Sequence, residues 1–144
     1  MSAGDMYLDT SAILPYYREE AKSSEVERLL MSLSVPVTIS ALCKVEFASA
    51  LSRWVRMGEL TEGQASLIQA TFDKDIETGL YMQTNIIATH FKLAEQWISR
   101  RKTSLRTLDA IHLACSHTMN KTLITCDHIL SHAARILGIR FIYI

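Results

Sequence analysis

Four carboxylates in this 144-residue sequence occupy positions that could do chemistry. Asp9 and Asp127 each end a short, mainly apolar run, whereas Glu46 and Asp109 lie inside longer apolar patterns. Oxygen ligands without a cluster of His and Cys are the set that Mg²⁺ and Mn²⁺ prefer. Such an ion lowers the pKa of a coordinated water and neutralises charge on a phosphate, which suits phosphoryl chemistry. The four side chains therefore predict a site for one or two divalent metal ions.

The two strand-end aspartates also have an ordinary structural interpretation. An Asp between a strand and a helix is a preferred N-cap, and such a cap is worth about 1 kcal/mol. We expect Asp9 to cap a helix over residues 10–17 and Asp127 to cap one over residues 128–137. A cap role is compatible with a metal role, because α/β proteins bind ligands at the carboxyl ends of their strands.

Glu46 and Asp109 are harder to explain as ordinary surface charges. On a helix that begins at Ser40, a wheel of about 100° per residue places Glu46 on the apolar face, opposite the expected charged face. Asp109 has apolar neighbours on both sides within its own helix. An unpaired buried carboxylate costs several kcal/mol, so each group needs a metal ion, a raised pKa or a cationic partner. Arg53 and Arg106 are the candidates for a plain structural salt bridge.

The elements that must position these acids alternate between strands and helices. The hydrophobic pattern predicts strands over residues 6–8, 35–39, 80–82, 122–125 and 140–143. Helices are expected over residues 10–17, 22–32, 40–57, 61–77, 84–101, 105–119 and 128–137. Gly58 and Gly138 end two of these helices, and Thr61–Gln64 has the pattern of a capping box. This alternation predicts an α/β fold with a parallel sheet covered by helices on both faces.

Composition is that of one globular domain, and we expect residues 1–144 to form it. Hydrophobic residues make up 49% and charged residues 21%, without a repeat or a Pro/Gly-rich linker. No apolar run approaches the roughly 20 residues that span a bilayer. The first ten residues lack the basic and apolar segments of a secretion signal. We therefore expect a cytoplasmic protein that has no membrane partner.

The charge balance permits a nucleic-acid ligand but does not argue for one. The chain has 15 basic and 15 acidic residues, whereas proteins that bind nucleic acids usually carry a basic excess. If a cation neutralises the four carboxylates, the remaining 11 acidic residues leave an excess of +4.

Cysteines and histidines indicate no second metal site. The three cysteines are far apart and form no C-x-x-C pair: Cys43, Cys115 and Cys126. In a cytosolic chain they are most simply reduced, half-buried residues. His128 and His132 have the spacing of a transition-metal pair, but an exposed helix start is the favoured interpretation. We expect His112 to be buried with its hydrogen bonds satisfied.

With their flanking residues, the four acids resemble the PIN domain family, and most closely its toxin ribonucleases of the VapC type. The similar stretches are Tyr7–Leu14, Val45–Leu51 with Arg53 and Gly58–Leu60, Leu105–Ala114, and Leu123–Asp127 with Leu137–Ile139. Each stretch alone is a weak signal, but together they span nearly the whole chain in the order of the family. The resemblance implies a three-layer PIN-like fold with a five-stranded parallel sheet.

The same resemblance implies an activity and its partners. It implies divalent-metal-dependent cleavage of RNA, in which the four acids bind Mg²⁺ or Mn²⁺ and perform catalysis. Thr10 or Ser11, together with Thr125, match small hydroxyl residues that support the site. Many family members are homodimers, and a small antitoxin holds the toxins inactive. We therefore expect an RNA substrate, a protein antitoxin and a homodimer.

Basic residues near the acids are candidates for holding the RNA. The expected reaction is an in-line attack of water on a phosphodiester, which leaves a 5′-phosphate and a 3′-hydroxyl. Contacts to the RNA backbone are expected from Arg53, Arg56 and Arg106. The cationic cluster at residues 100–102 is at least equally well explained as a solvated helix end.

Three other functions can be weighed from the same residues. A haloacid-dehalogenase-like phosphatase needs a second Asp two residues after the first, where this sequence has Ser11. A receiver domain of the response-regulator kind needs adjacent acids after its first strand, which Leu8–Thr10 does not supply. A non-catalytic PIN-fold module that binds RNA or protein is the serious alternative. The full set of four acids argues against it, because decayed modules usually lose some of them.

Overall fold

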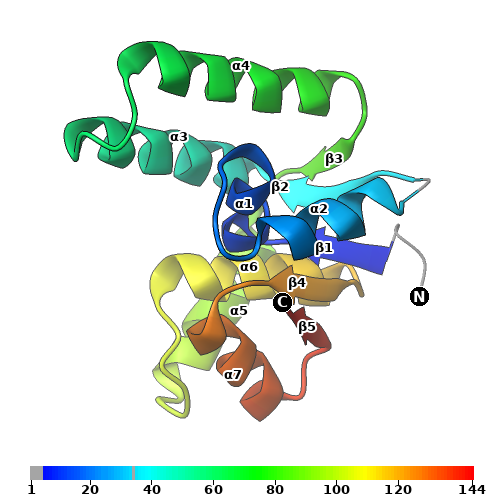
Figure 1. The fold of residues 1–144 in the computed structure, drawn as a ribbon. Coiled ribbons are helices and arrows are strands. Elements are labelled where there is room, and N and C mark those ends of the chain that lie inside the picture. Colours follow the sequence, from blue (N-terminus) through cyan, green and yellow to red (C-terminus); the bar gives the residue numbers. More distant parts are fainter. Residues whose placement is uncertain (1–4, 34) are drawn as a thin grey trace.

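The computed structural model describes residues 5–33 and 35–144. Its centre is a five-stranded parallel sheet with the strand order β3-β2-β1-β4-β5 (Figure 1). The strands are β1 (Met6–Leu8), β2 (Val37–Ser40), β3 (Tyr81–Thr84), β4 (Thr122–Thr125) and β5 (Phe141–Tyr143). The predicted α/β class with a five-stranded parallel sheet is confirmed. Because parallel strands end at the same edge, the segments that follow β1 and β4 meet there.

Helices cover both faces of the sheet. They are η2 (Thr10–Ala12), α1 (Leu14–Tyr17), α2 (Ser23–Met31), α3 (Ala41–Arg56), α4 (Glu62–Glu77), α5 (Ala88–Ser99), α6 (Thr107–Thr118) and α7 (His128–Leu137). One hydrophobic core joins the sheet to α1–α4, and a second core joins it to α5–α7. In Figure 1 the paired helices α3 and α4 lie above the sheet, and α5 and α7 lie below it. The result is the three-layer arrangement that the sequence predicts.

Successive side chains of each central strand pack alternately into these two cores. Met6 and Leu8 pack in the core of α1–α4, whereas Tyr7 between them packs in the core of α5–α7. In the same way Leu123 and Ile124 of β4 belong to different cores. Successive side chains of a strand point to opposite faces, so a strand buried on both faces is apolar throughout. This is why the two central strands were recognisable in the sequence.

A buried aromatic pair fixes α3, the helix that carries Glu46. The rings of Phe47 and Phe72 stack with their centroids 4.1 Å apart, which joins α3 to α4. The hydroxyl of Tyr17 donates to Asp75 Oδ2 at 2.7 Å, which ties α4 to α1. Because Phe47 points into the core, Glu46 beside it on the helix is directed elsewhere.

Two predicted helices are shorter in the structure than in the prediction. Residues 10–17 form the 3₁₀ turn η2 and then α1, because Pro15 has no N–H to continue a helix but is well suited to a first turn. The helix predicted over residues 84–101 begins only at Ala88, since Thr84 pairs with Ser40 as the end of β3. The capping box at Thr61 is confirmed, and so is the helix end at Gly138, whose φ of +70° suits glycine.

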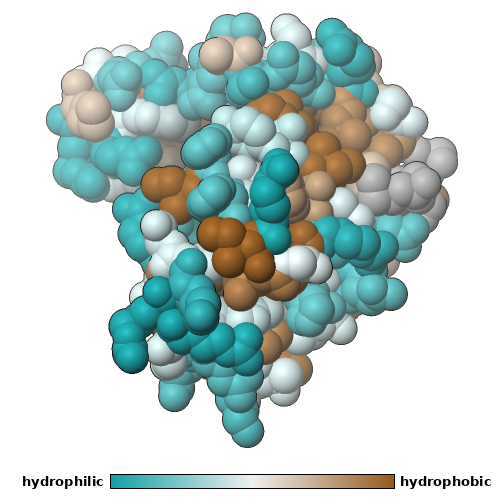
Figure 2. Space-filling view, turned by 90° about the horizontal axis from the view of Figure 1, so that it is seen from below, coloured by the Kyte–Doolittle hydropathy of each residue, from teal (hydrophilic) through white to brown (hydrophobic). Residues whose placement is uncertain are grey.

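Figure 2 shows the molecule from below, the side on which α5 and α7 lie in Figure 1. Hydrophilic residues cover much of this face, and apolar areas lie near the centre of the view and toward its upper right. Clustered apolar side chains on a surface are typical of contact with another protein.

Across residues 5–33 and 35–144, the structure contains no helix of the length and hydrophobicity that a membrane span requires.

Candidate active site

All four predicted acids line one pocket, which has a volume of about 470 Å³. The pocket lies beyond the carboxyl ends of β1 and β4, between α3 and α6. Its lining includes the acids Asp9, Glu46, Asp109 and Asp127, the polar residues Thr10, Ser11, Arg53 and His112, and the apolar residues Leu14, Leu42, Val45 and Leu108. Acids that are up to 118 positions apart in the sequence therefore face a common space.

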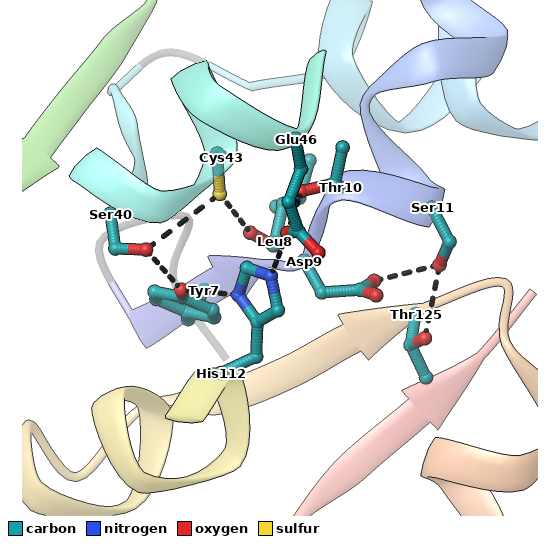
Figure 3. A network of polar contacts seen from close by, with 10 residues as sticks. All are labelled: Tyr7, Leu8, Asp9, Thr10, Ser11, Ser40, Cys43, Glu46, His112 and Thr125. Atoms are coloured by element: carbon teal, nitrogen blue, oxygen red, sulfur yellow. Dashed lines mark hydrogen bonds and ion pairs between the residues drawn. The ribbon is translucent and has the colours of Figure 1, made fainter. Parts of the chain in front are cut away.

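Asp9 is almost completely buried and is held by a network of hydroxyl groups (Figure 3). Its Oδ1 accepts a hydrogen bond from Ser11 Oγ at 2.8 Å. Ser11 Oγ also accepts from the backbone N–H of Cys126 at 2.9 Å and lies 3.2 Å from Thr125 Oγ1. Through these contacts the ends of β1 and β4 are joined. Asp9 occupies the N-cap position of η2, as expected, but its carboxylate bonds to Ser11 Oγ and makes no side-chain cap bond.

Burial sets the pKa of Asp9. Loss of water around the carboxylate raises the pKa of Asp9 from 3.8 to about 6, against the lowering effects of His112 and of the hydroxyls of Ser11 and Thr125. An added positive charge would favour the ionised form of this group.

Glu46 is held from two sides. Its Oε1 accepts hydrogen bonds from Thr10 Oγ1 at 2.6 Å and from His112 Nε2 at 2.5 Å. Burial acts to raise the pKa of Glu46, but the hydrogen bond and charge of His112, with help from Thr10, outweigh it and lower the pKa. The alternative of an Arg53 salt bridge is wrong, since Arg53 makes no ion pair with Glu46 in the part of the chain that the structure describes.

One oxygen of Asp109 has no hydrogen-bond partner among the residues that the structure describes. It lies in the first turn of α6, where the helix dipole favours an anion, and its side chain is 16% exposed. Its Oδ2 is buried without a hydrogen bond, and the nearest cation, Arg106 Nε, is 3.9 Å away on a side chain that is 77% exposed. Burial and the negative charge of Asp127 raise the pKa of Asp109 despite the attraction of Arg106.

Asp127 caps α7, as the sequence predicts. Its Oδ1 accepts from the backbone N–H groups of Ile129 at 2.9 Å and Leu130 at 3.4 Å. Its own N–H donates to Thr125 Oγ1 at 2.9 Å, so the predicted supporting threonine contacts both strand-end aspartate segments. The cap involves only Oδ1, which leaves the other oxygen of this half-buried side chain for the pocket.

The donor set of the pocket fits Mg²⁺ or Mn²⁺. Within residues 5–33 and 35–144, no three side chains of His, Cys, Asp or Glu converge closely enough to hold a metal ion by themselves. Mg²⁺ does not require such a cage, because it keeps several waters and binds through one or two carboxylates together with substrate phosphates. The buried, unpartnered Oδ2 of Asp109 is the atom whose cost a cation would remove.

The predicted basic residues divide into two groups. Arg53 lines the acid pocket, and Arg106 lines an adjoining pocket of about 360 Å³ together with Glu46 and Asp109. Arg56 lies elsewhere, in a pocket between α3 and α4, and donates to Ser52 Oγ at 2.7 Å. The helical repeat explains the difference, because at 100° per residue Arg53 is about 20° from Glu46 around α3 and Arg56 about 80°. The cluster at residues 100–102 follows α5 and lines neither acid-containing pocket.

A family comparison agrees with this geometry. The model of the PIN domain family matches residues 6–136, which is most of the chain. The chain belongs to the PIN domain family. Among curated protein sequences no significant match is found.

Solved structures similar to this PIN domain include toxins and toxin complexes. VapC20 of Mycobacterium tuberculosis, described as a toxin that cleaves the sarcin-ricin loop, is 17% identical with a TM-score of 0.68, over 89% of this chain and 94% of that one. FitAcB of Neisseria gonorrhoeae is 17% identical with a TM-score of 0.69, over 94% and 95%. A chain of the DNA-bound VapBC complex of Salmonella typhimurium is 15% identical with a TM-score of 0.69, over 99% and 98%. At such identities the likeness establishes a shared fold.

His112 lines the pocket of this PIN domain and contacts one of its acids, although the sequence did not assign it to the site. The prediction that it is buried with satisfied hydrogen bonds is confirmed, since it is 1% exposed and contacts Tyr7 and Glu46. The available signal was its spacing: His112 lies three residues after Asp109 and therefore on the same side of α6.

The prediction for the remaining histidine pair is confirmed, whereas two of the three cysteines are more deeply buried than the expected half-buried state. His128 and His132 are exposed at the start of α7, with nearly parallel rings 6.4 Å apart. The described cysteines are all free, with Cys43 and Cys115 buried and Cys126 partly buried.

Proposed function

We propose that this PIN domain is a divalent-metal-dependent endoribonuclease whose catalytic site is the acid pocket. The proposal rests above all on Asp109, whose Oδ2 is buried and unpartnered in a pocket lined by three further carboxylates. A buried carboxylate oxygen without a hydrogen bond is costly, and among the described residues its one ion pair is with the exposed Arg106, at 3.9 Å. A bound cation would remove that cost.

Each group in the pocket has a proposed role. The residues that would hold Mg²⁺ or Mn²⁺ are Asp9, Glu46, Asp109 and Asp127. When bound, the ion supplies a nucleophile at neutral pH and stabilises charge on the phosphate. The hydroxyls of Thr10 and Ser11 fix the neighbouring carboxylates through the hydrogen bonds described above. Thr125 Oγ1 supports the site by accepting from the backbone N–H of Asp127.

Arg53 and Arg106 are proposed to hold the RNA backbone. Both line a pocket that contains Glu46 and Asp109, and guanidinium groups bind phosphate oxygens in pairs. Arg56, which faces the α3–α4 side, has no part in this proposal.

The protein's partners are proposed from its fold relatives. Several similar structures are named as VapBC or toxin–antitoxin complexes, and one as a toxin that cleaves the sarcin-ricin loop. We infer that this PIN domain is the toxin of a type II pair, with an RNA substrate, a protein antitoxin and a homodimeric state. A non-catalytic module that binds RNA or protein is the second candidate.

An RNA-cleavage assay separates the two candidates. The nuclease proposal predicts cleavage with Mg²⁺ or Mn²⁺, none with EDTA, and none by Asp9→Asn. Asp75→Asn is the matched control, because Asp75 is a partly buried, hydrogen-bonded aspartate outside the pocket. Undiminished cleavage by Asp9→Asn, or equal cleavage in EDTA, would reject the proposed site.

A further inference from the structure

A buried chain of polar contacts leads from β2 to the acid pocket (Figure 3). The hydroxyl of Tyr7 donates to Ser40 Oγ at 2.8 Å and lies 2.7 Å from Nδ1 of His112. The other ring nitrogen of His112, Nε2, contacts Glu46 Oε1. Four residues from β1, β2, α3 and α6 are thus connected through the imidazole.

Burial makes the orientation of this imidazole definite. Tyr7 and Ser40 are 0% exposed and His112 is 1% exposed, so water does not compete for their hydrogen bonds. Buried polar groups that lose a partner are costly, which means that turning the ring would leave one or both nitrogens unsatisfied. With Nδ1 beside the phenol, Nε2 must face Glu46.

The contact fixes one oxygen of Glu46 and leaves the other free. Thr10 Oγ1 and His112 Nε2 reach the carboxylate from different elements, η2 and α6, and both bonds fall on Oε1. Among the residues that the structure describes, no hydrogen bond to Oε2 is found. The glutamate side chain is 23% exposed and lines the pocket, so the oxygen without a protein bond belongs to its accessible part.

We propose that His112 is a positioning residue, which holds the Glu46 carboxylate in the orientation required for binding the divalent ion. It acts only through Glu46, because both of its own nitrogens are engaged by Glu46 and Tyr7. The inference rests on the proposed function, since it takes Glu46 as a metal-binding residue. Removing an outer partner of a metal-binding side chain typically lowers metal affinity by about 10- to 100-fold.

Binding of Mn²⁺ to the protein alone, measured by calorimetry or by the electron paramagnetic resonance of free Mn²⁺, tests this role without an activity assay. His112→Leu is expected to weaken binding at least about 10-fold. His112→Gln, whose side-chain N–H can still donate to Glu46, should recover most of the loss. Tyr7→Phe should weaken binding by a smaller factor, since it removes only the group that orients the ring.

His90→Leu provides the matched control. His90 is also buried and bonded at both nitrogens, to the backbone N–H of Ile87 and to Thr118, but it lies on α5 and does not line the acid pocket. Both Leu variants should lower the melting temperature of the metal-free protein, whereas only His112→Leu should lower Mn²⁺ affinity. Glu46→Gln is expected to weaken binding in the same assay.

The possible results separate this inference from the proposed function. If Glu46→Gln weakens Mn²⁺ binding but His112→Leu does not, His112 has no positioning role and the nuclease proposal stands. Equal weakening by His90→Leu, or no recovery with His112→Gln, would likewise reject the positioning role. If the wild-type protein binds no Mn²⁺, both proposals fail together.

Discussion

The two sides of the acid pocket differ in the hydrogen bonds that they give to their carboxylates. On the side of β1 and α3, Asp9 and Glu46 accept hydrogen bonds from hydroxyl groups and an imidazole. On the side of α6, Asp109 has a buried oxygen without any hydrogen bond and a neighbouring Asp127 that repels it. The folded chain thus gives hydrogen bonds to both members of the first pair, although burial still raises the pKa of Asp9, while on the second side a buried carboxylate oxygen has none.

This difference indicates where a cation matters most. Arg106 is too distant and too exposed to offset the charge of Asp109 by much, because ion pairs of exposed side chains contribute little. Hydrogen bonds fix the positions of the carboxylates on the first side, whereas the negative charge on the α6 side is poorly compensated. We therefore expect the two substitutions considered next, one on each side, to change the unfolding free energy of the metal-free protein in opposite directions.

The largest effect is expected from Asp109→Asn. Wild-type protein with Mn²⁺ at 100 times its dissociation constant should gain about 2.7 kcal/mol of unfolding free energy, and most of this gain should vanish in the variant. Without metal, Asp109→Asn should be at least as stable as the wild type, because it removes a largely buried charge whose Oδ2 has no hydrogen bond and whose ion-pair partner, Arg106, is exposed. Thermal unfolding with Mn²⁺ and with EDTA measures both. If the variant gains as much unfolding free energy from Mn²⁺ as the wild type does, the ion does not bind at Asp109.

A smaller effect of opposite sign is expected from Ser11→Ala. This change removes the hydroxyl that joins Asp9, Thr125 and the N–H of Cys126, and leaves that N–H without its partner. The expected loss is about 1–3 kcal/mol of unfolding free energy in the metal-free protein, as measured by urea denaturation. If Ser11→Ala and wild type unfold at the same urea concentration, the hydroxyl network does not stabilise this side of the pocket.

The sequence predicts the features that depend on neighbouring residues, but not those that depend on contacts between distant segments. The bounds of β4 and α7 were predicted correctly, because an apolar run, the N-cap Asp127 and the final Gly138 are all local signals. The α/β class followed from the alternation of such segments. Asp9 lies at the predicted N-cap position, but the expected cap bond is absent because its carboxylate bonds to Ser11, which is itself fixed by residues more than 100 positions away.

The environments of the two acids on helices, Glu46 and Asp109, also could not be predicted from the sequence. A wheel indicated that Glu46 lies on an unusual face of its helix, but its contact with His112 spans 66 positions and depends on how α3 and α6 pack. The absence of a hydrogen bond at Asp109 Oδ2 is likewise a property of the packed chain. Sequence pattern identified the acids, and only their packing distinguishes their environments.

A further effect is expected in the pH dependence of stability without metal. The folded-state pKa of Asp9, about 6, lies above its unfolded value near 3.8, so the folded state binds the extra proton between these values. Its contribution to stability is full below about pH 4 and is lost as the pH rises to about 6. Asp9→Asn should remove this part of the pH profile, which urea denaturation from pH 4 to pH 7 measures. An unchanged profile would mean that the pKa of Asp9 is not raised.

A crystal of the protein soaked with Mn²⁺ tests the central claim most directly, through the anomalous scattering of the ion. The account predicts a peak within bonding distance of Asp109 Oδ2 and of at least one other acid of the pocket. A peak at the exposed pair His128 and His132 alone, or no peak at a Mn²⁺ concentration that supports RNA cleavage, would contradict it.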